Sequence, residues 1–289
     1  MQYAKISIWD PPYNIVYILL WSILSIQKGR IILKKEQQGL WLFRAIKHLV
    51  RIFYPKTELL GLENLPDEPC AVIGNHTQLH GPIACELYFP DNFYIWCASP
   101  MMKLKEVPAY AYKDFWSQKP KALRPLFKLI SYIIAPLSVL IFNNARTIAV
   151  YRDNRILTTF RESTAKLQDG KSVVIFPEQD KKHNHIVYDF HEGFVDIARH
   201  YYKRTGKELS FIPLYIAPKL KKMYLGEPIK FSADTPISEE RRRICDYLMN
   251  KITDIAVGLP EHTVIPYRNI PKKLYPKNIK KETEEWKSP

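Results

Sequence analysis

Residues 71–82 read Ala-Val-Ile-Gly-Asn-His-Thr-Gln-Leu-His-Gly-Pro, and this stretch decides the fold class. The short apolar run at 71–73 is typical of a buried strand, and the polar residues after it are typical of a loop. Pro82 opens a segment, 82–89, that we expect to be a helix, because proline is favoured at the first helical positions. A strand, a polar loop and a helix in this order indicate an α/β layered domain.

The same alternation continues along the chain. Short runs rich in β-forming residues predict strands near 71–73, 93–97, 147–151, 172–176 and 211–216. Helical patterns lie at 82–89, at 154–167 after a capping Asp153, at 193–205 before Gly206, and between Pro236 and Gly258. The sequence therefore predicts an α/β fold with a mixed, largely parallel central sheet flanked by helices.

Residues 1–56 are expected to form hydrophobic and amphipathic helices that associate with a membrane. The apolar run 15–26 is too short to span a bilayer, because twelve helical residues reach only about 18 Å. The pattern over 31–53 puts apolar and basic residues on different helix faces, which suits either a membrane interface or a core helix with a solvated basic side.

Residues 57–266 are expected to form the main domain, with a hydrophobic insertion at 126–142. The insertion is apolar except for Lys128 and Pro136, so it is interpreted as a hairpin or helix that either enters lipid or packs on the core. The lysine-rich residues 267–289 have little to bury and are expected to be a loosely ordered basic tail.

The chain has a formal charge of +14, with 43 Lys and Arg residues against 29 Asp and Glu. This excess predicts an anionic partner, and we expect an anionic membrane surface. Nucleic acid is not expected as a partner, because the basic residues are dispersed and no nucleic-acid motif is present. The four cysteines have no CxxC spacing and are expected to be buried, reduced thiols: Cys70, Cys85, Cys97 and Cys245.

Three polar loops follow predicted strands, which is where α/β folds place their sites. The first carries Asn75, His76, Thr77 and His80, and a histidine at neutral pH can accept a proton from an attacking hydroxyl. The other two carry charged candidates: Arg152, Glu178, Asp180, Lys181 and Lys182. Arg152, Lys181 and Lys182 are candidates to hold a phosphate, although a solvated charge run explains the lysines equally well.

A catalytic metal is not expected. His76 and His80 are four residues apart, a spacing that aligns ligands only on a helix, and Gly81 and Pro82 indicate that the helix begins later. No HExxH pattern occurs.

Four segments in order resemble the glycerolipid acyltransferases, the family that includes 1-acyl-glycerol-3-phosphate acyltransferase. Gly74-Asn75-His76-Thr77 resembles the start of the family's Asn-His-x4-Asp block, and Ile148-Ala149-Val150-Tyr151-Arg152 resembles its second block. Phe176-Pro177-Glu178 and Phe211-Ile212-Pro213-Leu214 resemble the third and fourth, so that the likeness covers roughly residues 57–257.

This resemblance implies an O-acyltransferase in which His76 is the general base. The acyl group would pass from acyl-CoA or acyl carrier protein to the hydroxyl of a lysophospholipid similar to lysophosphatidic acid. Arg152 and the third-block region would hold the acceptor phosphate, with Asn75, Thr77, His80, Lys181 and Lys182 as further binding candidates. No cofactor is implied, and the expected location is the cytoplasmic face of a membrane, peripheral or monotopic.

Two departures from the family pattern bear on activity. The family aspartate that orients the histidine would fall at position 81, where this chain has Gly81. Loss of the comparable carboxylate in a serine-protease triad costs about 10⁴ in kcat, so Glu178 and Asp180 are the candidates to replace it. Gln179-Asp180-Lys181 also replaces the family's usual glycine and phosphate-binding residues, so the acceptor can differ from lysophosphatidic acid. The alternative to an active enzyme is a non-catalytic or weakly active lipid-binding relative.

Overall fold

The computed structural model describes residues 39–116 and 120–279. The chain divides into two compact units, residues 1–49 and residues 50–289. In the first unit, residues 39–49 are helical, with Phe43 buried and Leu42 and Leu49 exposed. The predicted apolar run 15–26 lies outside the described residues.

The second unit contains a central sheet and a small hairpin. The strands of the sheet are β1 (Glu58–Leu60), β2 (Cys70–Gly74), β3 (Phe93–Ala98), β4 (Thr147–Val150), β5 (Ser172–Ile175), β8 (Ser210–Ala217), β9 (Lys222–Leu225) and β10 (Ile229–Lys230). The hairpin consists of β6 (Glu178–Lys182) and β7 (Tyr188–Phe190). The helices are α2 (His80–Tyr88), α3 (Val107–Ala111), α4 (Arg124–Asn144), α5 (Ile156–Gln168), α6 (Asp196–Thr205) and α7 (Ile237–Val257).

The strand order is β1-β9-β8-β2-β5-β3-β4, with β10 paired to β8. Neighbours from β8 to β4 are parallel, whereas β9 and β10 run antiparallel to β8. The predicted mixed, largely parallel sheet is therefore confirmed. All five predicted strands and the four predicted helices form within one or two residues of their expected bounds, except that 193–195 is a 3-10 turn before α6.

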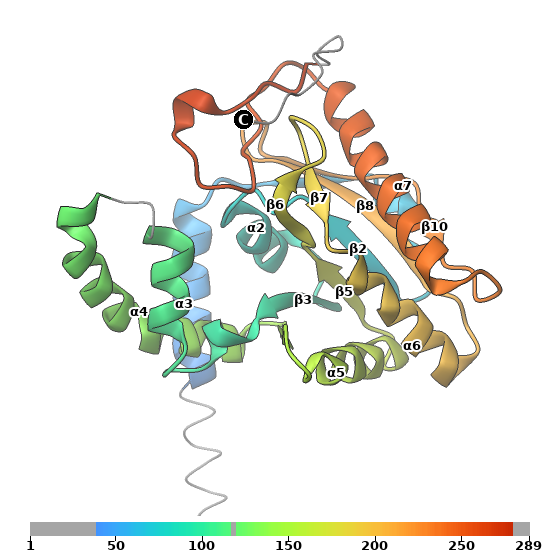
Figure 1. Cartoon of the computed structure of the whole chain (residues 1–289), viewed down its shortest axis with the longest axis horizontal. Helices are drawn as coiled ribbons and strands as arrows, with labels where there is room; N and C mark the ends of the chain where they lie inside the picture. The colour runs from blue at the N-terminus through green and yellow to red at the C-terminus, as the bar shows by residue number, and fades with distance from the viewer. Residues whose placement is uncertain (1–38, 117–119, 280–289) are drawn as a thin grey trace, which may run out of the picture. The chain divides into compact units, whose positions relative to one another are not determined.

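Alternate residues of the central strands face opposite layers of helices. Ala71 and Ile73 of β2 belong to one core cluster with residues of α5, α6 and α7. Val72 belongs to the other cluster, with Ala84 and Cys85 of α2. Figure 1 shows α5, α6 and α7 on one side of the sheet and α2 on the other. Because both faces are covered, the strands are continuous apolar runs.

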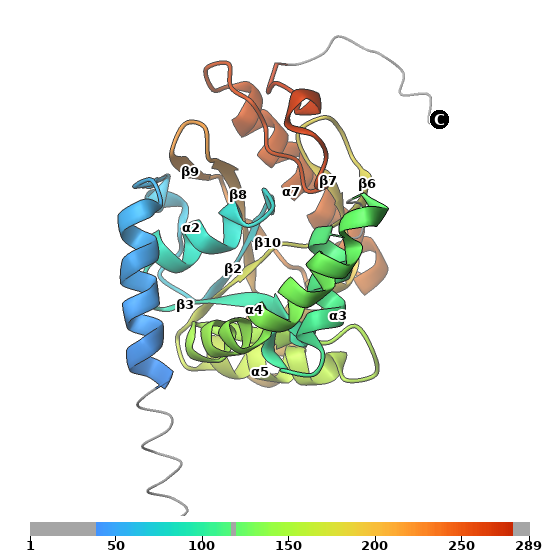
Figure 2. The same ribbon diagram turned by 90° about the vertical axis from the view of Figure 1, so that its left-hand side faces the viewer.

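The hydrophobic insertion is a helix, α4, preceded by a 3-10 turn (η4, Lys121–Leu123). Helix α4 packs on α3 and on the 3-10 turn η2 (Ser99–Met102), as Figures 1 and 2 show. Ser138 donates a hydrogen bond to the carbonyl of Met101 at 2.8 Å. Within the described residues, only the segment Lys121–Asn144 is long and apolar enough to cross a membrane by length and composition, and 17% of its most apolar window is buried.

Two expectations differ from the structure. Residues 178–182, expected as a polar loop, form strand β6, because β7 supplies the pairing that their own polar pattern does not indicate. Residues 267–279, expected as a loose tail, are placed against the domain: Asn278 is buried and donates to the carbonyl of Ala256 at 2.7 Å. The hydrogen bonds of the Asn278 side chain thus hold this segment to the domain, as buried apolar side chains hold other segments.

The cysteines agree with the sequence interpretation in most respects. All four are free, and Cys70, Cys85 and Cys245 are buried, whereas Cys97 is half-buried. Burial raises the pKa of the Cys97 thiol to about 12, which keeps it protonated at neutral pH.

Candidate active site

The first polar loop and the third-block residues lie together because their strands are neighbours in register. Ile73 of β2 pairs with Ile175 of β5 in parallel, and His76 and Glu178 each follow three residues later. Parallel strands end at the same sheet edge, so the two side chains emerge side by side. The main-chain N–H of His76 donates to Oε2 of Glu178 at 2.6 Å.

The loop between β2 and α2 has an unusual backbone. Thr77 and Gln78 have positive φ angles of 45° and 56°, a region that non-glycine residues rarely occupy. The main-chain N–H of Gly81 donates to the carbonyl of His76 at 3.2 Å, which closes the turn. Two consecutive left-handed residues beside a histidine hold the loop in a conformation that costs free energy, and such strain is concentrated at functional sites.

The imidazole of His76 is enclosed by aromatic rings. Phe176 contacts it edge-on with ring centroids 5.4 Å apart, and Tyr267 does so at 5.8 Å. Burial lowers the pKa of His76 to about 4, so the ring is neutral at pH 7. Nδ1 of His76 and Oγ1 of Thr77 are buried and have no hydrogen-bond partner among the described residues. The site therefore contains a neutral imidazole and two polar atoms that a ligand can satisfy.

Glu178 is buried and holds two main-chain groups. Oε2 accepts from His76, and Oε1 accepts the N–H of Tyr188 at 2.8 Å. Burial raises the pKa of Glu178 to about 7, although both hydrogen bonds favour the charged form. Glu178 thus fixes the main chain of His76 to β7. It is placed beside the candidate base, as predicted, but its hydrogen bond goes to the peptide group.

Gly81 occupies the position of the missing family aspartate, and the structure leaves no room for a side chain there. An added Cβ would lie 2.6 Å from the carbonyl oxygen of His76 and 3.1 Å from a ring carbon of Phe176. The first of these atoms is main chain and cannot move without changing the loop. Glycine at this position is therefore part of how the loop packs.

The remaining residues of the first loop have protein partners. Asn75 is buried and both donates to and accepts from the main chain of Ile216, at 3.2 and 2.7 Å, which joins the end of β2 to β8. Nδ1 of His80 lies 3.2 Å from the hydroxyl of Tyr54. Asn75 and His80, both predicted to bind substrate, have their polar groups engaged by the protein in this structure.

The charged residues after Glu178 extend away along β6. Asp180 forms a two-pronged ion pair with Arg268, with contacts of 2.5 and 2.9 Å. Lys181 pairs with Asp189 at 3.1 Å, and Lys182 is exposed. The structure gives Asp180 an arginine partner from the C-terminal segment, and it pairs Lys181 with Asp189 of β7.

Arg152 lines a cavity of about 320 Å³ at the same sheet edge. Ala98 of β3 pairs with Val150 of β4, so the residues that follow both strands meet there. The lining residues are Ala98, Ser99, Pro100, Glu106, Tyr110, Val150, Arg152, Asp153 and Arg155. Within residues 39–116 and 120–279, no hydrogen bond or ion pair joins Arg152 to another side chain, which leaves its guanidinium available to an anion.

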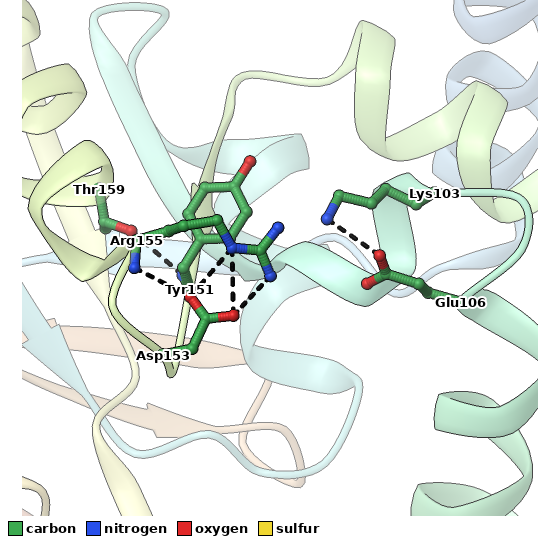
Figure 3. Close-up of polar contacts among 6 residues, drawn as sticks. All are labelled: Lys103, Glu106, Tyr151, Asp153, Arg155 and Thr159. Carbon is green, nitrogen blue, oxygen red and sulfur yellow. Dashed lines mark hydrogen bonds and ion pairs between the residues drawn. The ribbon is translucent and has the colours of Figure 1, made fainter.

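The other cations around this cavity are neutralised by neighbours, as Figure 3 shows. Arg155 forms an ion pair with Asp153 at 2.5 Å, and Lys103 forms one with Glu106 at 3.0 Å. Both cations also approach the ring of Tyr151, at 4.6 and 5.2 Å from its centroid. Arg152 is therefore the cation of the cavity that lacks such a pair within the described residues.

The ring of Tyr267 contacts His76 and also Tyr188 of β7, at a centroid distance of 5.7 Å. Burial raises the pKa of Tyr267. The charges of Asp114, Glu178 and Asp180 raise this pKa further, and the charge of Arg152 lowers it. Tyr110, which lines the cavity, has its pKa raised to about 12 mainly by burial and responds to Arg152 and Tyr267. Neither tyrosine was predicted. The apolar run Val264-Ile265-Pro266 before Tyr267 was the available signal, because such a run indicates packing.

Metal-ligating side chains do not gather in the described part of the chain. No group of three or more His, Cys, Asp or Glu side chains is placed there to hold a metal ion.

The comparisons with known proteins are sparse. No protein-family model matches the sequence, and no curated protein matches it at a significant level. One similar solved structure is that of the 1-acyl-sn-glycerophosphate (LPA) acyltransferase PlsC from Thermotoga maritima. The likeness covers 86% of this chain and 93% of that one, with 15% identity and a TM-score of 0.43. These values are too low to assign an activity to this chain.

Proposed function

We propose that this chain is an O-acyltransferase of the glycerolipid acyltransferase family. In this proposal it moves an acyl group from acyl-CoA or acyl carrier protein to the hydroxyl of a lysophospholipid, with His76 as general base. The observation that supports it most is the register of β2 and β5, which joins His76 to Glu178 at the edge where Arg152 lines a cavity. The segments that resemble the family's first three blocks thus meet at one sheet edge.

The chemistry requires an uncharged imidazole, which His76 has at pH 7. The burial that lowers its pKa to about 4 also weakens it as a base, because the best catalytic pKa lies near the operating pH. The imidazole takes the proton of the acceptor hydroxyl while the hydroxyl oxygen attacks the thioester carbon. The tetrahedral intermediate then expels the thiolate, which receives the proton from the imidazolium. The products are the new oxygen ester and the free thiol of the carrier.

The acceptor phosphate is assigned to Arg152. A guanidinium forms two parallel hydrogen bonds with phosphate oxygens. No hydrogen bond or ion pair occupies Arg152 within the described residues, and the nearby acidic group is Asp114, whose pKa burial raises and the charge of Arg152 lowers. Asp180 is paired with Arg268, so its repulsion towards a phosphate is reduced. A glycerol backbone between phosphate and hydroxyl would then extend from the cavity towards His76.

We also propose an anionic membrane surface as the partner, contacted by α4 from the cytoplasmic face in a peripheral or monotopic manner. Small residues of α4 face the protein, with Ser131, Ala135 and Ser138 buried. Its large apolar residues face outwards, and these are Leu126, Leu129, Tyr132, Ile133 and Leu137. A surface helix of a soluble protein turns its large apolar residues towards the core, whereas α4 turns them outwards. A large exposed apolar face indicates an interaction site.

Charges at the start of the same helix fit a lipid surface. Lys121, Arg124 and Lys128 are exposed there, next to the apolar face. Basic residues beside an apolar face bind anionic headgroups while the apolar side chains enter the headgroup and acyl boundary. A lysophospholipid held in such a surface would be close to the cavity, since η2 and α3 contribute both to the packing of α4 and to the cavity lining.

The alternative is a lipid-binding relative that does not turn over, and two observations favour it. Nδ1 of His76 has no acidic partner among the described residues, and Gly81 leaves no space for one. Without a carboxylate on Nδ1, the imidazolium formed during transfer is less stabilised, and the rate falls.

The experiment is a transfer assay with purified protein and vesicles. Two labelled donors are used, acyl-CoA and acyl carrier protein that carries the acyl group as a thioester. Each is tested with lysophosphatidic acid, with other lysophospholipids and with monoacylglycerol. The proposal predicts a labelled diacyl product from at least one phosphate-bearing acceptor. Saturable lysolipid binding with no product from either donor supports the non-catalytic alternative.

A further inference from the structure

The segment that follows α7 forms a closed loop, which we call the C-terminal loop, residues 263–277. Thr263 and Lys277 pair at its base as an antiparallel bridge. Below the bridge, the main-chain N–H of His262 donates to the side chain of Asn278 at 2.7 Å. His262 and Asn278 are buried, and the His262 ring lies 2.7 Å from the Tyr215 hydroxyl. The base is therefore anchored in the core.

The tip of the C-terminal loop covers the candidate base. The ring of Tyr267 contacts the imidazole of His76, Arg268 pairs with Asp180, and the amide of Gln78 donates to the Tyr275 hydroxyl at 2.9 Å. Figure 1 shows this red loop beside α2 and β6. One loop thus contacts both segments that carry the proposed catalytic chemistry.

The tip is held more weakly than the base. Arg268 and Asp180 are about half exposed, at 51% and 61%, and exposed ion pairs stabilise little. Between Arg268 and Tyr275, Ile270 is half-buried and the other residues are exposed, with Leu274 at 60%. Local opening has a low free-energy cost where buried contacts are few, so the tip can move while the base stays in place.

Closure by Tyr267 conflicts with transfer unless the tip moves. The cavity lined by Arg152 does not include His76 among its lining residues, and a general base must come within about 3 Å of the hydroxyl it deprotonates. Tyr267 packs on the imidazole. The charge of Arg152, which lines the cavity, lowers the pKa of the Tyr267 hydroxyl. Displacement of this ring would expose the side of the imidazole that it covers.

We propose that the tip of the C-terminal loop is a gate over His76, in which Tyr267 is the closing side chain and the Arg268–Asp180 pair is the latch. The gate excludes water from the imidazole when no acceptor is bound, and it opens to admit a lysolipid. Its role in acyl transfer rests on the proposed function, but its control of access to His76 does not. Loops that close over a site in this way commonly gate turnover.

The test measures access to His76 directly. Diethyl pyrocarbonate modifies neutral imidazole, and the rate at His76 is followed by peptide mass spectrometry in the full chain. Arg268→Gln removes the latch and should raise this rate roughly fivefold, the size expected from losing about 1 kcal/mol of closure. Tyr267→Ala removes the closing ring and should raise it further.

Lys207→Gln is the matched control. The Lys207–Glu68 pair is also exposed, at 59% and 60%, and it lies before β2 and β8, at the other edge of the sheet. The rate at His76 should be unchanged in this variant. His200, on α6, serves as an internal standard in every sample, because unfolding would raise its rate as well.

The outcomes separate the parts of the proposal. Unchanged His76 labelling in both Tyr267→Ala and Arg268→Gln, with His200 labelling constant, overturns the gate. A faster rate in Tyr267→Ala alone keeps the gate and overturns the latch. Faster labelling in both variants, with no acyl transfer by any form of the protein, supports the gate and counts against the proposed function.

Discussion

The Glu178 carboxylate accepts the main-chain N–H of His76 at 2.6 Å, while Nδ1 of the same histidine has no partner among the described residues. The carboxylate therefore fixes where the histidine lies and leaves its ring unassisted. Burial lowers the pKa of His76 to about 4, which disfavours the imidazolium that a general base forms.

Between about pH 4.5 and pH 7, His76 and Glu178 should change the free energy of unfolding with pH in opposite directions. Burial lowers the pKa of His76 from 6.5 to about 4, so the unfolded chain binds more protons and stability rises with pH. Burial raises the pKa of Glu178 from 4.5 to about 7, so the folded chain binds more protons and stability falls with pH. His76→Gln removes the rising part alone.

Urea unfolding across this pH range checks the prediction. The stability of His76→Gln minus that of wild type, in which other groups cancel, should decrease as pH rises and level off near pH 6.5. A difference that stays constant would mean that the His76 ring is solvated in the folded protein.

Substitution of Gly81 should destabilise the fold and should not raise activity above that of wild type. The Cβ of Gly81→Ala already meets the His76 carbonyl oxygen at 2.6 Å, and overpacking of this kind costs about 1 to 3 kcal/mol. Gly193→Ala is the matched control, because nothing lies within 4 Å of its added Cβ. Thermal unfolding compares the two alanine variants. A Gly81→Asp variant that is stable and turns over faster than wild type would contradict the packing argument.

Arg152→Gln should weaken binding of phosphate-bearing acceptors. Loss of a charge-assisted hydrogen bond costs about 1.5 to 3 kcal/mol, which corresponds to a KM increase of roughly 10- to 150-fold. Arg152→Lys should recover only part of this loss, because lysine lacks the planar fork. Steady-state kinetics with lysophosphatidic acid and monoacylglycerol separate the cases: an equal effect on both acceptors would place Arg152 outside the phosphate site.

The outward face of α4 should determine binding to anionic vesicles. Leu129 and Ile133 are 59% and 67% exposed, and glutamate at both positions should abolish most co-sedimentation with vesicles that contain anionic lipid. Leu157→Glu on α5 is the control, since Leu157 is 61% exposed on a different helix. Equal loss of binding in the control, or none in the double variant, would exclude α4 as the contact surface.

The parts of this protein that could be predicted follow from simple periodicity. Runs such as 71–73 and 173–176 are continuous apolar segments, which is what strands buried on both faces require. Because parallel strands end at one edge, the polar residues after them, including His76, Glu178 and Arg152, were expected to converge.

The rest depends on contacts between segments that no local pattern encodes. Glu178 was expected to orient an imidazole, and only the register of β2 and β5 directs it to a peptide N–H. Tyr267 lies in a region whose lysines suggested a loose tail, whereas buried Asn278 and His262 hold that region to the domain. Single polar anchors of this kind have no periodic signal in a sequence.

Catalysis by His76 is the claim on which the proposal depends most. The direct measurement is the initial rate of acyl transfer to a saturating phosphate-bearing lysolipid by wild type and by His76→Ala, with both proteins shown to be folded and to bind vesicles equally. We expect kcat to fall by about 10²- to 10⁴-fold in His76→Ala. Equal rates of product formation by the two proteins would contradict this claim.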